Sequence, residues 1–293
     1  MGEETRWPIG EILDWTAGYF QRQGVECPRL DAEVLLAHAL QIKRIDLYIR
    51  HGEIPSPEPV TRFKGLVGKR VEGCPVAYLV GKKEFYGQEF QVGPGVLIPR
   101  PDTECLVDCC LRLAKGENWQ SLLDLGTGSG CIAITLAKHL PGVQVTAVDI
   151  SPEALKIAEA NALALGVAKR VKFIAGDFFS PLDPGAAFDC IVSNPPYIPS
   201  GDISGLEPGV RNYEPHSALD GGASGFEPLE KIAQQAGAYL KNGGHLVVEI
   251  GSPQEQGARE RLAQMRGFRL FPSIKDGGGH PRVLYAHKEM PKE

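Results

Sequence analysis

From Thr103 onward, short apolar stretches with the pattern of strands alternate with amphipathic stretches typical of helices. Parallel strands need a crossover, usually a helix, so this alternation predicts a mostly parallel sheet with helices on both faces. The predicted strands are 122–125, 144–148, 171–174, 189–192 and 245–250, followed by two near Phe268 and 282–286. No helical pattern separates the last two, which favours an antiparallel edge. The predicted fold class is therefore α/β.

The first 83 residues carry a different pattern, with apolar side chains at helical spacing. They predict a small N-terminal bundle of four or five short helices over residues 1–83. Beyond it, Phe90 and Val92 alternate with polar residues, and Gly93-Pro94-Gly95 precedes Val96-Leu97-Ile98. We interpret residues 84–102 as a β-hairpin linker that turns at Gly93-Pro94-Gly95. Residues 103–293 then form the α/β domain.

Composition limits the class of protein. The chain has 293 residues, a formal net charge of −5 and 43% hydrophobic residues, which suits about two folded domains and argues against a general nucleic-acid coat. Seven scattered cysteines without a CxxC pair are typical of thiols in a reducing compartment, and we predict no metal site. No apolar run approaches the ~20 residues of a membrane span. We expect a cytoplasmic protein without membrane association.

A glycine-rich loop, Asp124-Leu125-Gly126-Thr127-Gly128-Ser129-Gly130, lies where the first predicted strand passes into a helix. Glycine permits a tight turn and close approach of a ligand to the backbone. The spacing GxGxG lacks the extra residue of the dinucleotide fingerprint GxGxxG. Asp149 ends the second strand, where a carboxylate can accept hydrogen bonds from both hydroxyls of a ribose. Together they predict an adenosine-type ligand without a pyrophosphate, with S-adenosylmethionine as the leading candidate.

Two alternatives stand beside that interpretation: the loop is a purely structural turn, or Asp149 is only a helix N-cap before Ser151-Pro152. A third carboxylate, Asp177, follows the next strand with Phe178 and Phe179. An acidic group there can bind the exocyclic amine of adenine while an aromatic ring covers its face. Packing in the core is the alternative for either phenylalanine.

Asn194-Pro195-Pro196-Tyr197 follows an apolar strand and should lie at the carboxyl end of the sheet, beside the ligand crevice. The prolines stiffen the turn and remove two backbone donors. The Asn194 side-chain oxygen and the Pro195 carbonyl can accept both hydrogens of a planar NH₂ group, and Tyr197 can stack on its face. No general base is required, because the nitrogen loses its proton after attacking a methyl group. The motif predicts an amino-group methyltransferase; a Pro-Pro turn without function is the alternative.

With these motifs the chain resembles the release-factor glutamine methyltransferases, the HemK-type family, over essentially its whole length. The resemblance includes Asp31-Ala32-Glu33 in the helical domain, Ile98-Pro99-Arg100-Pro101-Asp102-Thr103-Glu104 and Glu214-Pro215. The Asn-Pro-Pro-Tyr box alone is shared with DNA adenine methyltransferases, whereas the Arg-Pro-Asp-Thr-Glu stretch together with the helical domain is far more specific. The resemblance implies a class I, Rossmann-like methyltransferase domain with a helical substrate-recognition domain. It implies transfer of methyl from S-adenosyl-L-methionine to the side-chain amide nitrogen (N5) of the Gly-Gly-Gln glutamine in class 1 peptide chain release factors, leaving S-adenosyl-L-homocysteine.

The resemblance also assigns residues. We expect a catalytic set of Asn194, Pro195 and Tyr197, and a substrate-binding set of Asn194, Pro195, Pro196, Tyr197 and Arg100. We expect a donor-binding set of Gly126, Thr127, Gly128, Ser129, Gly130, Asp149, Asp177, Phe178 and Asn194. Phe178 stands where many members have Trp, and Ser224 stands where an acid is common, so we assign Ser224 no role.

Positive charge is concentrated in residues 43–83, with nine Lys or Arg against four acids. We hypothesise that this basic zone, which includes Lys69 and Arg70, docks an acidic surface of the release factor; a solvated helix face is the alternative. Rival functions are a glutamine methyltransferase of a large-subunit ribosomal protein, an N6-adenine nucleic-acid methyltransferase and a silent donor-binding scaffold. The acidic balance of residues 84–293 disfavours a nucleic-acid substrate.

Residues 199–225 fit neither a helical nor a strand pattern and contain several glycines. A loop of this length inside a compact domain is usually a lid or a binding segment, with simple disorder as the alternative. The sequence leaves open whether this loop closes over the site.

Overall fold

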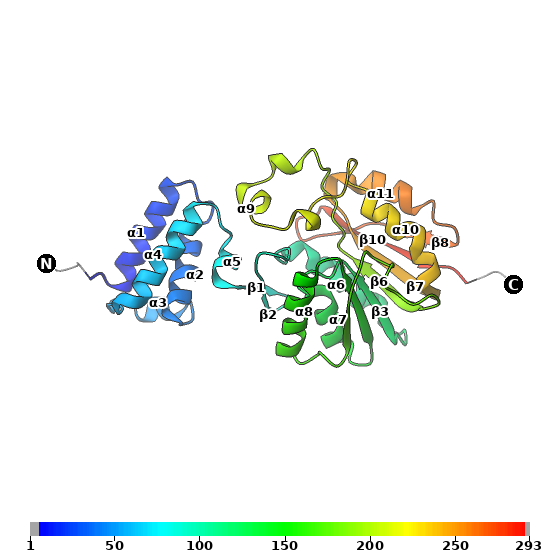
Figure 1. The fold of residues 1–293 in the computed structure, drawn as a ribbon, viewed down its shortest axis with the longest axis horizontal. Coiled ribbons are helices and arrows are strands. Elements are labelled where there is room, and N and C mark those ends of the chain that lie inside the picture. The colour runs from blue at the N-terminus through cyan, green and yellow to red at the C-terminus, as the bar shows by residue number, and fades with distance from the viewer. Residues whose placement is uncertain (1–5, 291–293) are drawn as a thin grey trace. The chain divides into compact units, whose positions relative to one another are not determined.

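The computed structural model describes residues 6–290 and divides the chain into two compact units. The helical unit runs up to Gly81 and includes Pro208–Tyr213; the α/β unit comprises Lys82–Glu207 and the chain from Glu214 onward. Figure 1 shows the elements of both. Among the described residues, no helix is both long enough and apolar enough to cross a membrane.

The helical unit is a small bundle, as predicted. It contains α1 (Ile9–Arg22), α2 (Pro28–Leu40), α3 (Asp46–Ile49), α4 (Pro57–Val71) and α5 (Val76–Val80). Pro28 and Pro57 open α2 and α4, positions where proline costs no helical hydrogen bond. Their apolar faces meet in one core, whose largest fully buried side chains are Ile9, Leu13, Phe20, Leu35, Leu36 and Leu47.

Two acids of the Asp31-Ala32-Glu33 segment lie at the edge of this core, 8% and 5% exposed. Each has a cationic partner: Arg70 Nε lies 2.7 Å from Asp31 Oδ2, and Arg29 Nε lies 2.8 Å from Glu33 Oε1. Buried carboxylates are tolerated when they are paired in this way. The segment therefore joins α2 to α4 by charge as well as by apolar packing.

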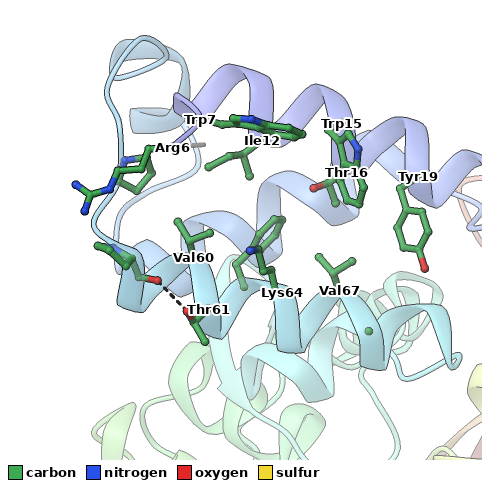
Figure 2. Close-up of a pocket in the computed structure, with 14 residues that line it drawn as sticks. Arg6, Trp7, Ile12, Trp15, Thr16, Tyr19, Val60, Thr61, Lys64 and Val67 are labelled. Atoms are coloured by element: carbon green, nitrogen blue, oxygen red, sulfur yellow. Dashed lines mark hydrogen bonds between the residues drawn. The ribbon is translucent and has the colours of Figure 1, made fainter. Parts of the chain in front are cut away.

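A groove of about 580 Å³ runs between α1 and α4 of the helical unit (Figure 2). Aromatic rings from the N-terminal part of the chain line it: Trp7 and Trp15 meet edge to face at 6.2 Å, and Trp15 stacks on Tyr19 at 5.3 Å. Half of the Trp15 side chain is exposed. Lys64 of α4 lies across the groove from these rings.

The β-hairpin is present, but the predicted turn was wrong. Its strands are β1 (Lys82–Phe85) and β2 (Gln88–Gln91), and the two-residue turn between them is Tyr86-Gly87. Both turn residues have positive φ, 52° and 67°, which matches the twist of an antiparallel pair. Residues 96–98 form no strand, because the Ile98 N–H donates to the Glu214 carboxylate at 3.1 Å instead of to a neighbouring strand.

The α/β unit is built on an eight-stranded sheet of order β5-β4-β3-β6-β7-β10-β8, with β9 paired to β10. Strands β3 to β7 are parallel and β10 is antiparallel to β7, β8 and β9, which confirms the mostly parallel sheet with an antiparallel edge. The strands are β3 (Ser121–Leu125), β4 (Gln144–Asp149), β5 (Val171–Ala175), β6 (Phe188–Ser193), β7 (Leu240–Glu249), β8 (Phe268–Leu270), β9 (Ile274–Lys275) and β10 (Pro281–Lys288).

Helices cover both faces of this sheet (Figure 1). On one face, Leu122 and Val145 pack with α6 (Glu104–Leu113), α7 (Cys131–His139) and α8 (Pro152–Ala164). On the other, Leu123 and Val148 pack with α10 (Glu227–Tyr239) and α11 (Glu255–Leu262). Because successive side chains of a strand point to opposite faces of the sheet, each strand contributes to both cores. Strand order reverses between β3 and β6, the position where open α/β sheets bind ligands.

The 199–225 segment is more ordered than its sequence suggested. It contains η2 (Ile203–Gly205), α9 (Pro208–Arg211) and η3 (His216–Ala218), and a parallel bridge joins Ile198 to Asp220. Within the helical unit, the Tyr213 hydroxyl donates to the Glu72 carbonyl at 3.2 Å. The remaining short elements are η1 (Pro101–Thr103) and η4 (Ser252–Gln254).

Asn161 of α8, 1% exposed, joins the hairpin to the glycine loop. Its Oδ1 accepts from Gln91 N at 2.7 Å, and its Nδ2 donates to Gln91 O and Ser129 O at 3.0 and 2.9 Å. We predict that Asn161→Ala lowers the free energy of unfolding by about 2–4 kcal/mol, because three backbone groups lose their partners, one of them fully buried. Chemical denaturation measures this. The exposed control Asn118→Ala should change stability by less than ~0.5 kcal/mol, and equal losses would contradict the account.

Candidate active site

A cavity of about 320 Å³ lies at the carboxyl edge of the parallel strands, wholly within the α/β unit. This volume is within the range of about 300–1,000 Å³ found for small-molecule sites. Seven residues predicted for the site line it: Gly126, Gly128, Asp149, Asp177, Phe178, Asn194 and Pro196. They come from the ends of four different strands, so the topology brings together motifs that lie far apart in the sequence.

The glycine loop needs glycine for backbone conformation. Gly126, Gly128 and Gly130 have φ of 74°, 56° and 80°, in the left-handed region that favours glycine. Side chains at Gly126 and Gly128 would meet no protein atom within 4 Å, which leaves their backbone open to a ligand in the cavity. At Gly130 a Cβ would lie 2.7 Å from Ile134 and 3.1 Å from Ala158, so here glycine allows close packing of α7 on α8.

Asp149 holds the loop from the neighbouring strand. Its Oδ2 accepts from Gly128 N at 2.7 Å and its Oδ1 accepts from Ser151 N at 2.9 Å. The α8 N-cap is Ser151, whose hydroxyl accepts from Ala154 N at 3.1 Å, so the helix-cap alternative for Asp149 was wrong. Burial raises the pKa of Asp149, and the backbone hydrogen bonds lower it. The backbone donors are Gly128, Ser151 and Ile150, and the residue lines the cavity.

Asp124 supports the same loop from beneath. The side chain is fully buried, and its Oδ2 accepts from the Thr127 hydroxyl at 2.6 Å. Burial raises the pKa of Asp124 to about 7, against opposing hydrogen bonds from Thr127 and the Ala133 backbone. Thr127 is itself 3% exposed, so the pair is an internal brace of the loop.

The two phenylalanines after β5 have different surroundings. Phe179 is 1% exposed and stacks on Tyr239 at 4.9 Å, so packing in the core accounts for it. Phe178 has a positive φ of 47°, rare for an aromatic residue, and lines the cavity. Asp177 lines the cavity beside it, with Lys231 Nζ at 3.4 Å from its Oδ2.

The Asn194-Pro195-Pro196-Tyr197 turn is fixed at both ends. Before it, the buried Ser193 hydroxyl donates to the Leu125 carbonyl at 2.7 Å, which joins the end of β6 to the end of β3. After it, the Tyr197 carbonyl accepts from Gln254 Nε2 at 2.8 Å. A Cβ on Gly221 would lie 2.8 Å from the Tyr197 backbone, so glycine there lets the 199–225 loop pack directly on the turn.

Six predicted site residues do not line the cavity. Thr127, Ser129 and Gly130 are buried in the glycine loop, and Pro195 and Tyr197 belong to the Asn194 turn without lining the cavity. Arg100 is paired with Glu214, Nη2 to Oε1 at 2.5 Å, and donates to the Ile98 carbonyl at 3.1 Å. The structure thus ties Arg100 to the 199–225 loop; its role as a substrate ligand stays a prediction.

Several residues that line the cavity were not predicted from the sequence. Val96 and Leu97, interpreted as a strand, line the cavity from the hairpin side. Ile150, 62% exposed, and Lys231 complete the donor side, and Pro215, Ser217, Ala218 and Asp220 close it from the 199–225 loop. The isoleucine directly after Asp149 was a signal available in the sequence, because an apolar residue at a strand end can cover a flat ligand.

Each of the two units contains a region that matches a known protein family. The family described as "PrmC N-terminal domain" matches residues 11–81, and the "Methyltransferase small domain" matches residues 103–204. The release factor glutamine methyltransferase of Rhodopirellula baltica is 42% identical over 290 residues, which cover 97% of this chain and 98% of the relative. That of Geobacter sulfurreducens is 46% identical over 278 residues, covering 95% and 96%.

Solved structures support the fold alone. A methyltransferase of Pyrococcus furiosus has a TM-score of 0.50 at 19% identity, covering 76% of this chain and 98% of that one. A 16S rRNA methyltransferase of T. Thermophilus, solved with AdoMet and guanosine, has a TM-score of 0.51 at 21% identity, covering 71% and 50%. Together with the matched domain, they confirm the class I methyltransferase fold of the α/β unit.

The buried Asp124 predicts a pH-dependent stability. Its pKa of about 7 in the folded chain exceeds the ordinary 3.8, so the folded state binds this proton more tightly than the unfolded chain. The free energy of unfolding should therefore fall as pH rises from about 4 to 7. Asp124→Asn removes this contribution, so the stability of the variant relative to wild type should rise between pH 5 and pH 8.

Denaturation midpoints at pH 5, 6.5 and 8 measure that difference. The exposed control Asp202→Asn should show a difference that is the same at every pH. A pH-independent difference for Asp124→Asn would contradict the buried, proton-binding carboxyl.

Proposed function

Because this chain belongs to the family of release factor glutamine methyltransferases, we propose that it methylates the side-chain amide nitrogen (N5) of a glutamine in class 1 peptide chain release factors. The methyl donor is S-adenosylmethionine and the target is the glutamine of the Gly-Gly-Gln motif. The observation that carries the proposal is the single cavity in which Asn194 meets Gly126, Gly128 and Asp149. The carboxyl edge of the sheet thus carries both the proposed binding site for the substrate amide and the proposed binding site for the nucleoside of the donor.

The residues present fit the donor. Gly126 and Gly128 leave backbone open on the cavity wall, and the Asp149 carboxylate on the same wall is the proposed acceptor for ribose hydroxyls. Phe178 supplies an aromatic face for adenine, and Asp177 an acceptor for its amine. When bound there, S-adenosylmethionine supplies an electrophilic methyl group.

The Asn194 turn binds and orients the glutamine amide. Asn194 Nδ2 donates to Thr103 Oγ1 at 3.3 Å, which leaves Oδ1 to accept one hydrogen of the substrate NH₂ group. We assign the other hydrogen to the Pro195 carbonyl and stacking on the amide plane to Tyr197; neither residue lines the cavity, so both roles stay predictions. Holding the nitrogen in an attacking geometry can lower the barrier by ~7–11 kcal/mol, so orientation is the main catalytic contribution of these residues.

The alternative functions receive no support. Relatives named for release factor glutamine methylation match this chain over 95–97% of its length, and the PrmC N-terminal domain matches the helical region. Neither a ribosomal-protein target nor an adenine target has a comparable observation in its favour.

We place the reaction in the cytoplasm. All seven cysteines are free thiols, four of them buried, which suits a reducing compartment. This placement agrees with a substrate that acts in translation termination.

The helical unit supplies the docking surface for the release factor in this proposal. Lys69 is exposed, whereas Arg70 is committed to Asp31 and only about one fifth exposed. We propose that the docking surface includes Lys69 and Lys64, both exposed, of which Lys64 lines the aromatic groove of Figure 2. Arg70 is a structural residue, and its replacement would disturb the bundle itself.

The function is tested by transfer of labelled methyl from S-adenosylmethionine to a purified class 1 release factor. We expect one methyl group on the Gly-Gly-Gln glutamine, located by mass spectrometry, and no label when that glutamine is replaced. Asn194→Ala should lower kcat by at least about 100-fold, because the amide loses its orienting acceptor. Label on the release factor with replaced glutamine, or label only on DNA or ribosomal protein, would contradict the proposal.

Docking through the basic zone predicts a separate kinetic effect. Lys69→Glu should raise the KM for the release factor about threefold or more at low salt, with kcat and donor affinity unchanged. The matched control is Lys172→Glu, an exposed lysine of the α/β unit. Equal KM values for the two variants would remove Lys69 from the docking surface.

A further inference from the structure

Glu249 is a buried carboxylate that the proposed mechanism does not use. It is the last residue of β7, the parallel neighbour of β6, and Ser193 of β6 pairs with Val248. The register therefore places Glu249 beside Asn194, the first residue after β6. Its side chain is 2% exposed and does not line the cavity, and its Oε2 is buried without a hydrogen-bond partner.

Thr103 stands between this carboxylate and the Asn194 side chain. The Thr103 hydroxyl, 2% exposed, accepts from Asn194 Nδ2 at 3.3 Å. Hydrogen bonds from Thr103 and from Asn194 to Glu249 both lower the pKa of the carboxyl. An ionised carboxylate only accepts, and a hydroxyl has one donor, so the hydroxyl hydrogen of Thr103 points to Glu249 and its lone pair to Asn194.

This direction matters because a side-chain amide has two orientations related by a half turn. One presents Oδ1 to the cavity and the other presents Nδ2. Only the first can accept from a substrate NH₂ group; the second sets donor against donor. Acceptors behind Asn194 hold Nδ2 on the buried side, and those acceptors are Thr103 and Glu249.

We infer that Glu249 is a positioning residue that, through Thr103, fixes Asn194 with its side-chain oxygen toward the substrate amide. This inference rests on the proposed function for its kinetic consequence; the orientation rests on the strand register and on the hydrogen bond from Asn194 to Thr103. Glu249 does not line the cavity, so it acts on the reaction through Asn194.

The protonation state of Glu249 makes the orientation of Asn194 depend on pH. Burial raises the pKa of Glu249 to about 7; hydrogen bonds from Thr103 and Asn194 and the charge of Arg282 oppose the rise, and Asp102 adds to it. The other titratable groups that face Glu249 are Tyr197, Cys105 and Cys131. A protonated Glu249 can donate to Thr103 and reverse the direction of the hydrogen bonds, so the orientation weakens below about pH 7.

Matched substitutions at Thr103 test the inference. Thr103→Val keeps the shape and removes the hydroxyl, whereas Thr103→Ser keeps the hydroxyl. We expect Thr103→Val to lower kcat about tenfold or more, Thr103→Ser to retain kcat within about twofold, and both to bind S-adenosylhomocysteine like wild type. Wild-type kcat should fall as pH drops from 8 to 6, and Glu249→Gln should lack that fall.

The orientation has a readout that needs no activity. In wild type, the side-chain NH₂ resonances of Asn194 should shift with pH as Glu249 titrates, and they should be insensitive to pH in Glu249→Gln. In Thr103→Val the shift should be smaller, because only the direct hydrogen bond from Asn194 to Glu249 remains. Equal loss of kcat in Thr103→Val and Thr103→Ser, or Asn194 resonances that ignore Glu249, would overturn the inference. A wild type that transfers no methyl would overturn the proposed function instead, while the resonances would still decide the orientation.

Discussion

Hydrogen bonds that leave the sheet at its carboxyl edge hold the whole site together. Ser193 Oγ donates to the Leu125 carbonyl at 2.7 Å, and the N–H groups of Gly126 and Thr127 donate to the Val148 carbonyl at 2.8 and 3.0 Å. Strands β3, β4 and β6 are thereby locked to one another just where their loops begin. Because the cavity is made of those loops, its shape follows from the sheet and not from the flexibility of each loop.

The same edge concentrates buried polar groups. Asp124 and Glu249 lie behind the glycine loop and the Asn194 turn, and burial raises the pKa of each to about 7. Ionising them costs stability, which apolar residues of similar volume would avoid. Both carboxyls orient neighbouring side chains. Asp124 accepts a hydrogen bond from Thr127 of the glycine loop, and Glu249 acts through Thr103 on the Asn194 side chain, which lines the cavity.

The motifs that directly follow strands were the features best predicted from the sequence. The glycine loop, Asp149 and the Asn194 turn each follow a strand, and carboxyl ends of parallel strands share one edge, so their meeting could be foreseen. The hairpin turn could not be placed, because Gly93-Pro94-Gly95 has a stronger turn signal than Tyr86-Gly87, where the chain turns. Glu249 ends an apolar strand with no local signature; its role depends on the register of β7 against β6.

A crystal structure with S-adenosylhomocysteine would test the central claim most directly: that one preformed cavity at this edge binds the donor and presents an oriented amide acceptor. We predict the nucleoside between Gly128, Asp149 and Phe178, with the Asn194 side-chain oxygen toward the cavity and its nitrogen on Thr103. A nucleoside bound outside this cavity, or an Asn194 nitrogen that faces it, would contradict the account.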